Sequence, residues 1–487
     1  MRLGLRNAIG SSDAPTISSL AVMAEQPSFD RSITEGPIHS AVWKIAWPTM
    51  LQNVFAGVQG VVDHVMVGRY VGFEANAAIG VSWQIFLVVV IFISSLYSGM
   101  SVLVARFAGA GKAEKVNRVV YQVFLTSTFI GLFIFAPLGY LLAPDLLGLV
   151  HATPGVQEEA LPYLRILFVF SLGMMHFFMF GGALRAAGDA RTPMRLGILL
   201  TILNLTLNVI LIRGLGPIPA FGTRGAAMGT VIATGIVAGI AFYLVFRGAL
   251  VVRFTGLKRW LPDWTIISQV VKFGLPTGFQ GIAMNIGGVL MMRYVGLLER
   301  SAEAQAAFAV GYTQLFSLIT WTSTALLAAA ATVAGQNLGA EQPERAAIAP
   351  RSSALLGLSV AVPTGLLFLI IPQTLLGIFG MEDPIVLSLG QQLLVYLSLS
   401  GVFLTIALSY TGGLQGTGDT RSPMFISLIS QLILPLSLCA VINAVRGLQP
   451  ADIWFAVVLG HFVRCVLSIG RFRQGKWKEI EVKIAEA

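Results

Sequence analysis

Charged residues are scarce in this chain. Asp, Glu, Lys and Arg together make up 11% of its 487 residues, whereas a soluble globular domain carries about 25%. Hydrophobic residues account for 55%. This composition excludes an ordinary water-soluble protein and indicates a protein whose surface faces lipid.

Residues that form disulfides, bind metals or catalyse reactions are also few. The chain has two cysteines and five histidines. Cys439 and Cys465 lie in apolar segments, so we expect buried hydrophobic side chains there and no disulfide. The motifs GxxxxGK[ST], HExxH and CxxC are missing from the sequence. We therefore expect no enzyme activity, no direct coupling to ATP and no cofactor.

Long apolar segments recur along most of the chain, and each is long enough to cross a bilayer, which needs about 20 residues. Their apolar character is continuous and does not alternate, so it predicts helices and not barrel strands. The fold class is therefore an all-α polytopic membrane protein. We expect twelve spans, near residues 42–67, 83–106, 119–142, 161–184, 194–213, 226–246, 267–292, 305–333, 353–376, 391–413, 424–445 and 453–470.

The net charge of +9 comes from basic residues in short loops and in the C-terminal tail. No basic run has interleaved aromatic residues, so we expect no nucleic-acid partner. Basic residues follow spans two, four and six, whereas the loops after spans three and nine are acidic. This bias predicts a multi-pass protein of the cell membrane with both termini in the cytoplasm.

An internal repeat reveals a duplication. The segment GALRAAGDARTPM at 182–194 returns as GGLQGTGDTRSPM at 412–424, with seven of thirteen positions identical at an offset of 230. Both copies follow an even-numbered span, so the two halves have the same orientation. We expect a disordered cytoplasmic tail (1–40), an N-terminal six-helix lobe (41–246), a cytoplasmic linker (247–266), a C-terminal six-helix lobe (267–470) and a basic cytoplasmic tail (471–487).

The repeated loop has a clear turn chemistry. Gly permits positive φ, Asp can cap the next helix, and Pro suits the first helical turn. Two roles remain open: turn architecture with topology, or gating in which Asp and Arg exchange partners as the halves rock. The residues concerned are Gly188, Asp189, Arg191, Pro193, Gly418, Asp419, Arg421 and Pro423.

Asp63 is the carboxylate that lies clearly inside a predicted span. Charges inside a membrane usually line a cavity or serve a function, and burial favours uptake of a proton. Asn204 and Asn208 share one face of span five, and Thr230 begins span six. These amides and this hydroxyl could bind a carboxylic acid or offer oxygens to Na⁺. The alternatives are that Asp63 only reaches the membrane interface and that the polar residues pair helices.

The repeated loop, Pro48 near the start of span one and VVDHVMVG at 61–68 together resemble the multidrug and toxic compound extrusion (MATE) family. The resemblance covers roughly residues 41–470. It implies two parallel-repeat six-helix lobes that form a V-shaped cleft, and export of organic cations, drugs or other toxic compounds in exchange for H⁺ or Na⁺.

The same resemblance makes Asp63, Asn204, Asn208 and Thr230 similar to the family's N-lobe cation site, which couples H⁺ or binds Na⁺. A second carboxylate can occur in the family where this chain has Asn208. Spans seven and ten contain no Asp or Glu, so a Na⁺ site in the C-terminal lobe is not expected. The partners implied are a small-molecule substrate, H⁺ or Na⁺ and the lipid bilayer, and we expect a monomer.

Three other functions are alternatives for a membrane protein of this composition. A lipid-linked oligosaccharide flippase or polysaccharide exporter of related architecture would need more fixed cations in its cavity to meet phosphates. A membrane enzyme acting on lipids would need clustered His, Asp or Glu near an interface. A passive channel is compatible with the duplication, but it could not perform uphill efflux.

Overall fold

The computed structural model describes residues 29–254 and 261–482, and within these ranges the chain is almost entirely helical. Lipid offers no hydrogen-bond partners to a backbone, so spanning segments satisfy their N–H and C=O groups internally. The predicted all-α membrane fold is confirmed.

Twelve helical spans follow one another, and six lie in each half of the sequence. The first six are α3 (Ile38–Tyr70), α4 (Phe73–Gly109), α5 with η1 and α6 (Ala113–Ile130, Gly131–Phe135, Ala136–Leu149), α7 with α8 (Pro154–Val169, Ser171–Ala186), α9 (Arg191–Arg213) and α10 (Gly222–Phe246). Among these, α7 and α8 meet at a bend of 52°.

The second six spans begin after the connection near residue 250. They are α11 (Trp264–Gly296), α12 with η2 and α13 (Ser301–Phe308, Ala309–Leu315, Ser317–Gly339), α14 (Pro343–Ile370), α16 (Pro384–Thr417), α17 with η3 and α18 (Arg421–Ser427, Leu428–Ile433, Leu434–Arg446) and α19 (Pro450–Arg473). Short helices α2 (Ser32–Glu35), α15 (Pro372–Gly377) and η4 (Lys476–Glu479) lie outside these spans.

Spans one and seven contain polar residues in their middle parts. Within the described ranges, nine helices are long and apolar enough to cross a membrane, and the bent pair α7–α8 adds a tenth. The remaining two, α3 and α11, are each 33 residues long but carry polar side chains such as Gln59 and Gln280. Both helices line cavities, which explains why they tolerate polar residues inside a membrane.

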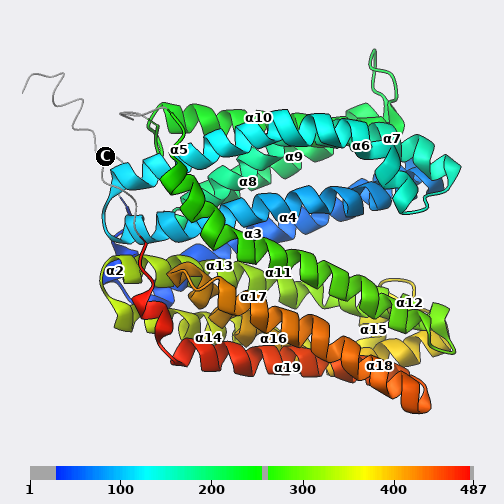
Figure 1. Cartoon of the computed structure of the whole chain (residues 1–487). Coiled ribbons are helices and arrows are strands. Elements are labelled where there is room, and N and C mark those ends of the chain that lie inside the picture. The colour runs from blue at the N-terminus through cyan, green and yellow to red at the C-terminus, as the bar shows by residue number, and fades with distance from the viewer. Residues whose placement is uncertain (1–28, 255–260, 483–487) are drawn as a thin grey trace, which may run out of the picture.

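The two halves form two bundles. In Figure 1, helices α3 to α10 make the upper bundle and α11 to α19 the lower one. The bundles meet at the end where α2 lies and separate towards the opposite end (Figure 1). We call them the first and second bundle.

The contact between the bundles depends on glycines at equivalent positions of the repeat. A Cβ on Gly109 of α4 would lie 1.9 Å from the carbonyl oxygen of Gln336, and a Cβ on Gly339 of α13 would lie 2.0 Å from that of Arg106. Each glycine thus packs on the backbone of the opposite helix. The two contacts are equivalent, as expected if a pseudo-twofold axis relates the two halves. Side chains at these positions would keep the helices apart.

A second close crossing joins α4 to α11. A Cβ on Gly99 would lie 2.0 Å from the carbonyl oxygen of Val270, and one on Gly274 would lie 2.3 Å from that of Ser95. Helix α3 also reaches the second bundle, because the side-chain amide of Asn53 donates to the carbonyl of Trp321 at 3.1 Å. The first bundle therefore makes these contacts with the second bundle through α3 and α4.

The folded part of the N-terminus begins earlier than predicted. Residues 1–28 of the expected tail (1–40) lie outside the described residues, but residues 32–35 form α2 and α3 begins at Ile38. Ile33 is fully buried. Asn337 and Arg345 of the second bundle donate to the carbonyls of Ile33 and Gly36 at 3.1 and 2.5 Å. The sequence did not predict this folded segment, because a single buried residue such as Ile33 produces no hydrophobic periodicity.

The basic C-terminal segment is also partly folded. Trp477 is 1% exposed, and its indole N–H donates to the carbonyl of Phe472 at 2.8 Å. In the connection at 247–266, Val252 and Phe254 are buried and Asp263 caps α11. Residues 255–260 and 483–487 of these two segments lie outside the described residues. The C-terminal segment and the connection between the bundles therefore both pack against the helices.

We predict that Gly109→Ala weakens the contact between the bundles. The added methyl group meets a backbone oxygen that cannot turn away, so the free energy of unfolding should fall by about 2 kcal/mol. Thermal unfolding of the purified protein in detergent measures this. Gly239→Ala is the matched control, because nothing lies within 4 Å of its added Cβ on α10. Equal stability of the two variants would contradict the close crossing.

Candidate functional site

Asp63 faces a cavity inside the first bundle. It lies about two turns before the end of α3 and is half-buried. The cavity, which we call the first-bundle cavity, has a volume of about 430 Å³ and is lined by Gln52, Asn53, Gln59, Asp63, Tyr163, Thr201, Thr230 and several apolar residues. Asp63 is the one carboxylate among its described lining residues, so the negative charge of this cavity resides there.

The four residues predicted from the sequence are connected by one chain of hydrogen bonds. Asn208 Nδ2 donates to Asp63 Oδ1 at 2.6 Å and to Asn204 Oδ1 at 3.2 Å. Asn204 Nδ2 donates to Thr230 Oγ1 at 3.1 Å. Thr230 in turn donates to the carbonyl of Ala226 at 3.1 Å. Helices α3, α9 and α10 therefore meet at Asp63.

The hydrogen bonds of this network fit an ionised Asp63, because the amide of Asn208 donates to its carboxylate. Both Asn204 and Asn208 are fully buried, so their amides are held in place by packing. The amide nitrogen of Asn208 faces Asp63, and its Oδ1 has no hydrogen-bond partner among the described residues. This oxygen lies against Gly229, where a Cβ would come within 2.1 Å of it. A protonated Asp63 would keep one carbonyl oxygen as an acceptor and gain one O–H donor, and the Asn208 amide could accept from this O–H only by turning over.

Gln59 is a site residue that the sequence analysis missed. It lies one turn before Asp63 on α3 and lines the same cavity. Its Oε1 accepts a hydrogen bond from Thr201 of α9 at 3.3 Å. The i, i+4 spacing to Asp63 was the available signal. His64 also lines this cavity, but its Nδ1 pairs with Asn76 at 2.7 Å and its side chain is exposed.

A cation could be held by oxygen atoms of this network. The carboxylate of Asp63, Oδ1 of Asn204 and the hydroxyl of Thr230 are suitable ligands for Na⁺. In the observed geometry the amide nitrogen of Asn208 stands between two of them, so Na⁺ would require Asn208 to turn. Within the described residues no three His, Cys, Asp or Glu side chains cluster as a metal site.

A second cavity lies between the bundles. This central cavity has a volume of about 480 Å³. It is lined by α4 and the end of α8 of the first bundle and by α11, η2, α13, α16 and α19. Gln280 of α11 donates to Ser427 Oγ at 2.8 Å and accepts from Gln415 Nε2 at 3.2 Å. No Asp or Glu is among its described lining residues. Its chemistry therefore differs from that of the first-bundle cavity.

The sequence analysis also missed Arg464, which lines the central cavity from α19. The signal was present, because an arginine inside a predicted span is a functional candidate by itself.

The two copies of the repeated loop have the same backbone but different partners. Gly188 and Gly418 have φ of 101° and 102°. Asp189 accepts from the backbone N–H of Thr192 at 3.0 Å, and Asp419 accepts from that of Ser422 at 3.1 Å. Both aspartates therefore cap the next helix. Pro193 and Pro423 are buried in its first turn, while Arg191 and Arg421 are exposed.

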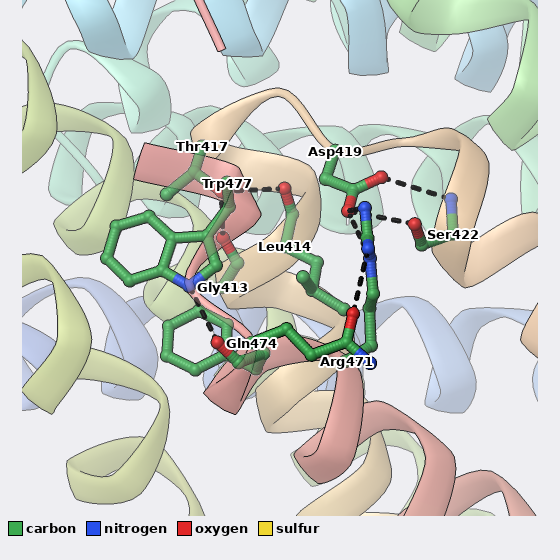
Figure 2. Close-up of polar contacts among 9 residues, drawn as sticks. Gly413, Leu414, Thr417, Asp419, Ser422, Arg471, Gln474 and Trp477 are labelled. Atoms are coloured by element: carbon green, nitrogen blue, oxygen red, sulfur yellow. Dashed lines mark hydrogen bonds and ion pairs between the residues drawn. The ribbon is translucent and has the colours of Figure 1, made fainter. Parts of the chain in front are cut away.

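Only the second copy makes an ion pair among the described residues. Arg471 at the end of α19 binds Asp419 with its Nε at 2.9 Å and a second nitrogen at 2.8 Å, as Figure 2 shows. Neither aspartate pairs with the arginine of its own loop. The loop of the second bundle is therefore connected to α19. In the first copy, Asp189 only accepts the hydrogen bond from the next helix.

Comparison with known proteins gives a consistent result. A family model described as MatE matches residues 48–210 and 276–441, one segment in each half. The chain is 29% identical over 453 residues to the probable multidrug resistance protein NorM of Thermotoga maritima, covering 92% of this chain and 95% of the relative.

Solved structures share the fold. One, described as the outward-facing conformation of a multidrug resistance MATE family transporter of the MOP superfamily, has a TM-score of 0.86 at 20% identity and covers 94% of this chain and 100% of its own. Another, a MOP superfamily transporter from Pyrococcus furiosus, has a TM-score of 0.85 at 19% identity, with the same coverage.

We predict that the two loop aspartates differ in importance. Asp419→Ala removes a cap and leaves Arg471 without its carboxylate, so the free energy of unfolding should fall by about 3 kcal/mol. Asp189→Ala, the matched control at the same repeat position, removes a cap alone and should cost about 1 kcal/mol. Thermal unfolding in detergent ranks the variants, and an equal loss in both would contradict the asymmetry.

Proposed function

Since this chain belongs to the MatE family of multi-pass membrane transporters, we propose that it is a secondary active antiporter that exports organic cations, drugs or other toxic small molecules in exchange for H⁺ or Na⁺. The observation that carries this proposal is the network of Asp63, Asn208, Asn204 and Thr230 beside the first-bundle cavity.

A group that binds either the substrate or the coupling ion, but not both at once, is one way to couple antiport. Asp63 suits this role because it is the one carboxylate among the described residues that line its cavity. A cationic substrate is attracted by the ionised form, and a proton or Na⁺ on Asp63 removes that attraction. Binding of the ion therefore releases the substrate.

The hydrogen bonds support H⁺ more directly than Na⁺. Asn208 donates to the carboxylate. Protonation weakens this hydrogen bond because the acceptor loses its charge, and it adds an O–H group that Asn208 can accept only by turning its amide. Turning the Asn208 amide moves its Oδ1 away from Gly229 and also breaks the bond to Asn204. Protonation of Asp63 would thus change side-chain contacts of α9 and α10.

Helix α3 could transmit the change to the rest of the molecule. Pro48 lies inside this helix and cannot donate a backbone hydrogen bond, so α3 can bend there. The part of α3 beyond Pro48 bears Asn53, which contacts the second bundle, and Asp63. A ligand shifts the two states only by its differential affinity for them, and the network provides such a difference.

The orientation and the assembly are further parts of the proposal. The charges of the loops support both termini in the cytoplasm of a cell-membrane protein. With this orientation, the bundles meet at the cytoplasmic end and separate towards the outside (Figure 1). We infer an outward-open state of a monomer with two six-helix lobes, 41–246 and 267–470.

We predict that Asp63→Asn abolishes transport. The variant keeps the shape of the side chain but cannot bind H⁺ or hold a cation, so ethidium efflux from proteoliposomes should fall at least about 10-fold under an imposed gradient. Separate pH and Na⁺ gradients identify the ion. Asp145→Asn, an exposed carboxylate on α6, is the matched control.

Efflux that survives in the Asp63→Asn variant would refute this role for Asp63. Efflux by the wild type without any ion gradient would refute antiport and favour a passive channel. A wild type that moves no cationic dye under either gradient would refute the substrate class.

A further inference from the structure

Arg464 is the most buried arginine of the described residues, and it lies deep in the predicted membrane region. It is 2% exposed and stands nine residues before the end of α19 (Pro450–Arg473), about 13 Å along the helix axis. Its side chain lines the central cavity. A cation at this depth is costly unless it has a partner or serves a ligand.

The guanidinium group has no hydrogen bond or ion pair with any residue in the ranges 29–254 and 261–482, and its Nε is buried without a partner. Two half-buried arginines of this chain have partners. Arg106 donates to the carbonyl of Ile480 at 2.7 Å, and Arg345 to that of Gly36 at 2.5 Å. Those arginines connect distant segments of the chain, although Nη1 of Arg106 is also buried without a partner. Arg464 makes no such connection to the described residues.

The residues beside Arg464 cannot neutralise it. His461 lies one turn earlier on α19, and its Nδ1 is engaged with Ser400 Oγ at 2.5 Å. The described lining of the central cavity contains no carboxylate. Its other polar groups include Tyr312, Gln415 and Ser101, of which Ser101 Oγ is also buried without a partner. The cavity therefore combines one fixed positive charge with neutral hydroxyl and amide groups.

The shape and walls of the cavity indicate the kind of ligand. Leu327, Leu404, Leu408 and Met284 line it, and a volume of about 480 Å³ suits a drug-sized molecule. The planar guanidinium matches a carboxylate through two parallel hydrogen bonds. A single fixed cation fits a monoanion better than a polyanionic diphosphate.

We propose that the central cavity is a binding site for amphiphilic organic carboxylates, in which Arg464 binds the carboxylate and the apolar walls bind the rest of the molecule. The first-bundle cavity, with Asp63, has the opposite charge. The two cavities would thus serve different ends of a zwitterion, or substrates of different charge. That these ligands are exported rests on the proposed efflux function, but their binding does not.

Binding of a matched pair of probes tests this site. Dansylglycine bears a carboxylate, and dansylglycinamide has the same fluorescent body with a neutral end. Titration of the purified wild type in lipid nanodiscs should show at least about 10-fold tighter binding of dansylglycine, because hydrogen bonds between charged groups are strong. Empty nanodiscs correct for partition into lipid.

Variants assign the preference to Arg464. Arg464→Gln should remove the difference between the probes while still binding dansylglycinamide, which also shows that the variant is folded. Arg464→Lys should keep part of the preference. Lys272→Gln is the matched control, because it removes one exposed positive charge from the same bundle and should leave the preference unchanged.

Equal affinity of the wild type for both probes would overturn the proposal, and so would a full preference in Arg464→Gln. If Arg464→Gln does not fold, the wild type is tested by competition instead. Displacement of bound dansylglycine is measured with 1-naphthaleneacetate and with its amide. Only the carboxylate should displace it, and equal displacement by the amide would refute the site. Because the readout is binding, failure of ion-driven efflux in the Asp63 experiment does not affect this result.

Discussion

The close crossing of α4 and α13 is the contact on which the rest of the architecture depends. Gly109 and Gly339 each pack on a backbone carbonyl of the other helix, so the bundles are joined at one end by direct backbone contact. Because little side-chain volume lies between them there, the bundles can diverge towards the other end and leave a central cavity. The same crossing brings the repeated loops of both halves to one end of the molecule.

The membrane explains where the polar residues lie. A polar group that faces lipid is costly, so the spans that bear such groups turn them inward. Helices α3 and α11 bear such groups, and they line the first-bundle cavity and the central cavity respectively. The duplication produced two related bundles, but their cavities have diverged. One contains a carboxylate with amide partners, and the other contains an unpaired guanidinium.

The candidate site was predictable to the extent that local rules apply. Asp63 was identified because a carboxylate inside an apolar span is costly, and Asn204 and Asn208 because a spacing of four residues places them on one helix face. Thr230 was assigned through the resemblance of the whole set to a known family. Arg464 could have been found by the rule that identified Asp63. Ile33 and Trp477 could not, because a single apolar residue in a polar segment shows no periodicity.

The sequence by itself determined the number of spans, the duplication and the all-α fold, because these follow from hydropathy, from loop residues and from the need of a backbone in lipid to satisfy its own hydrogen bonds. Only the tertiary structure decided which groups meet. Asn208 reaches Asp63 across 145 residues of chain, Asp419 pairs with Arg471 on another helix, and Arg464 has no partner among the described residues. Such pairings depend on how helices pack, and packing is set by contacts between distant segments that no local pattern encodes.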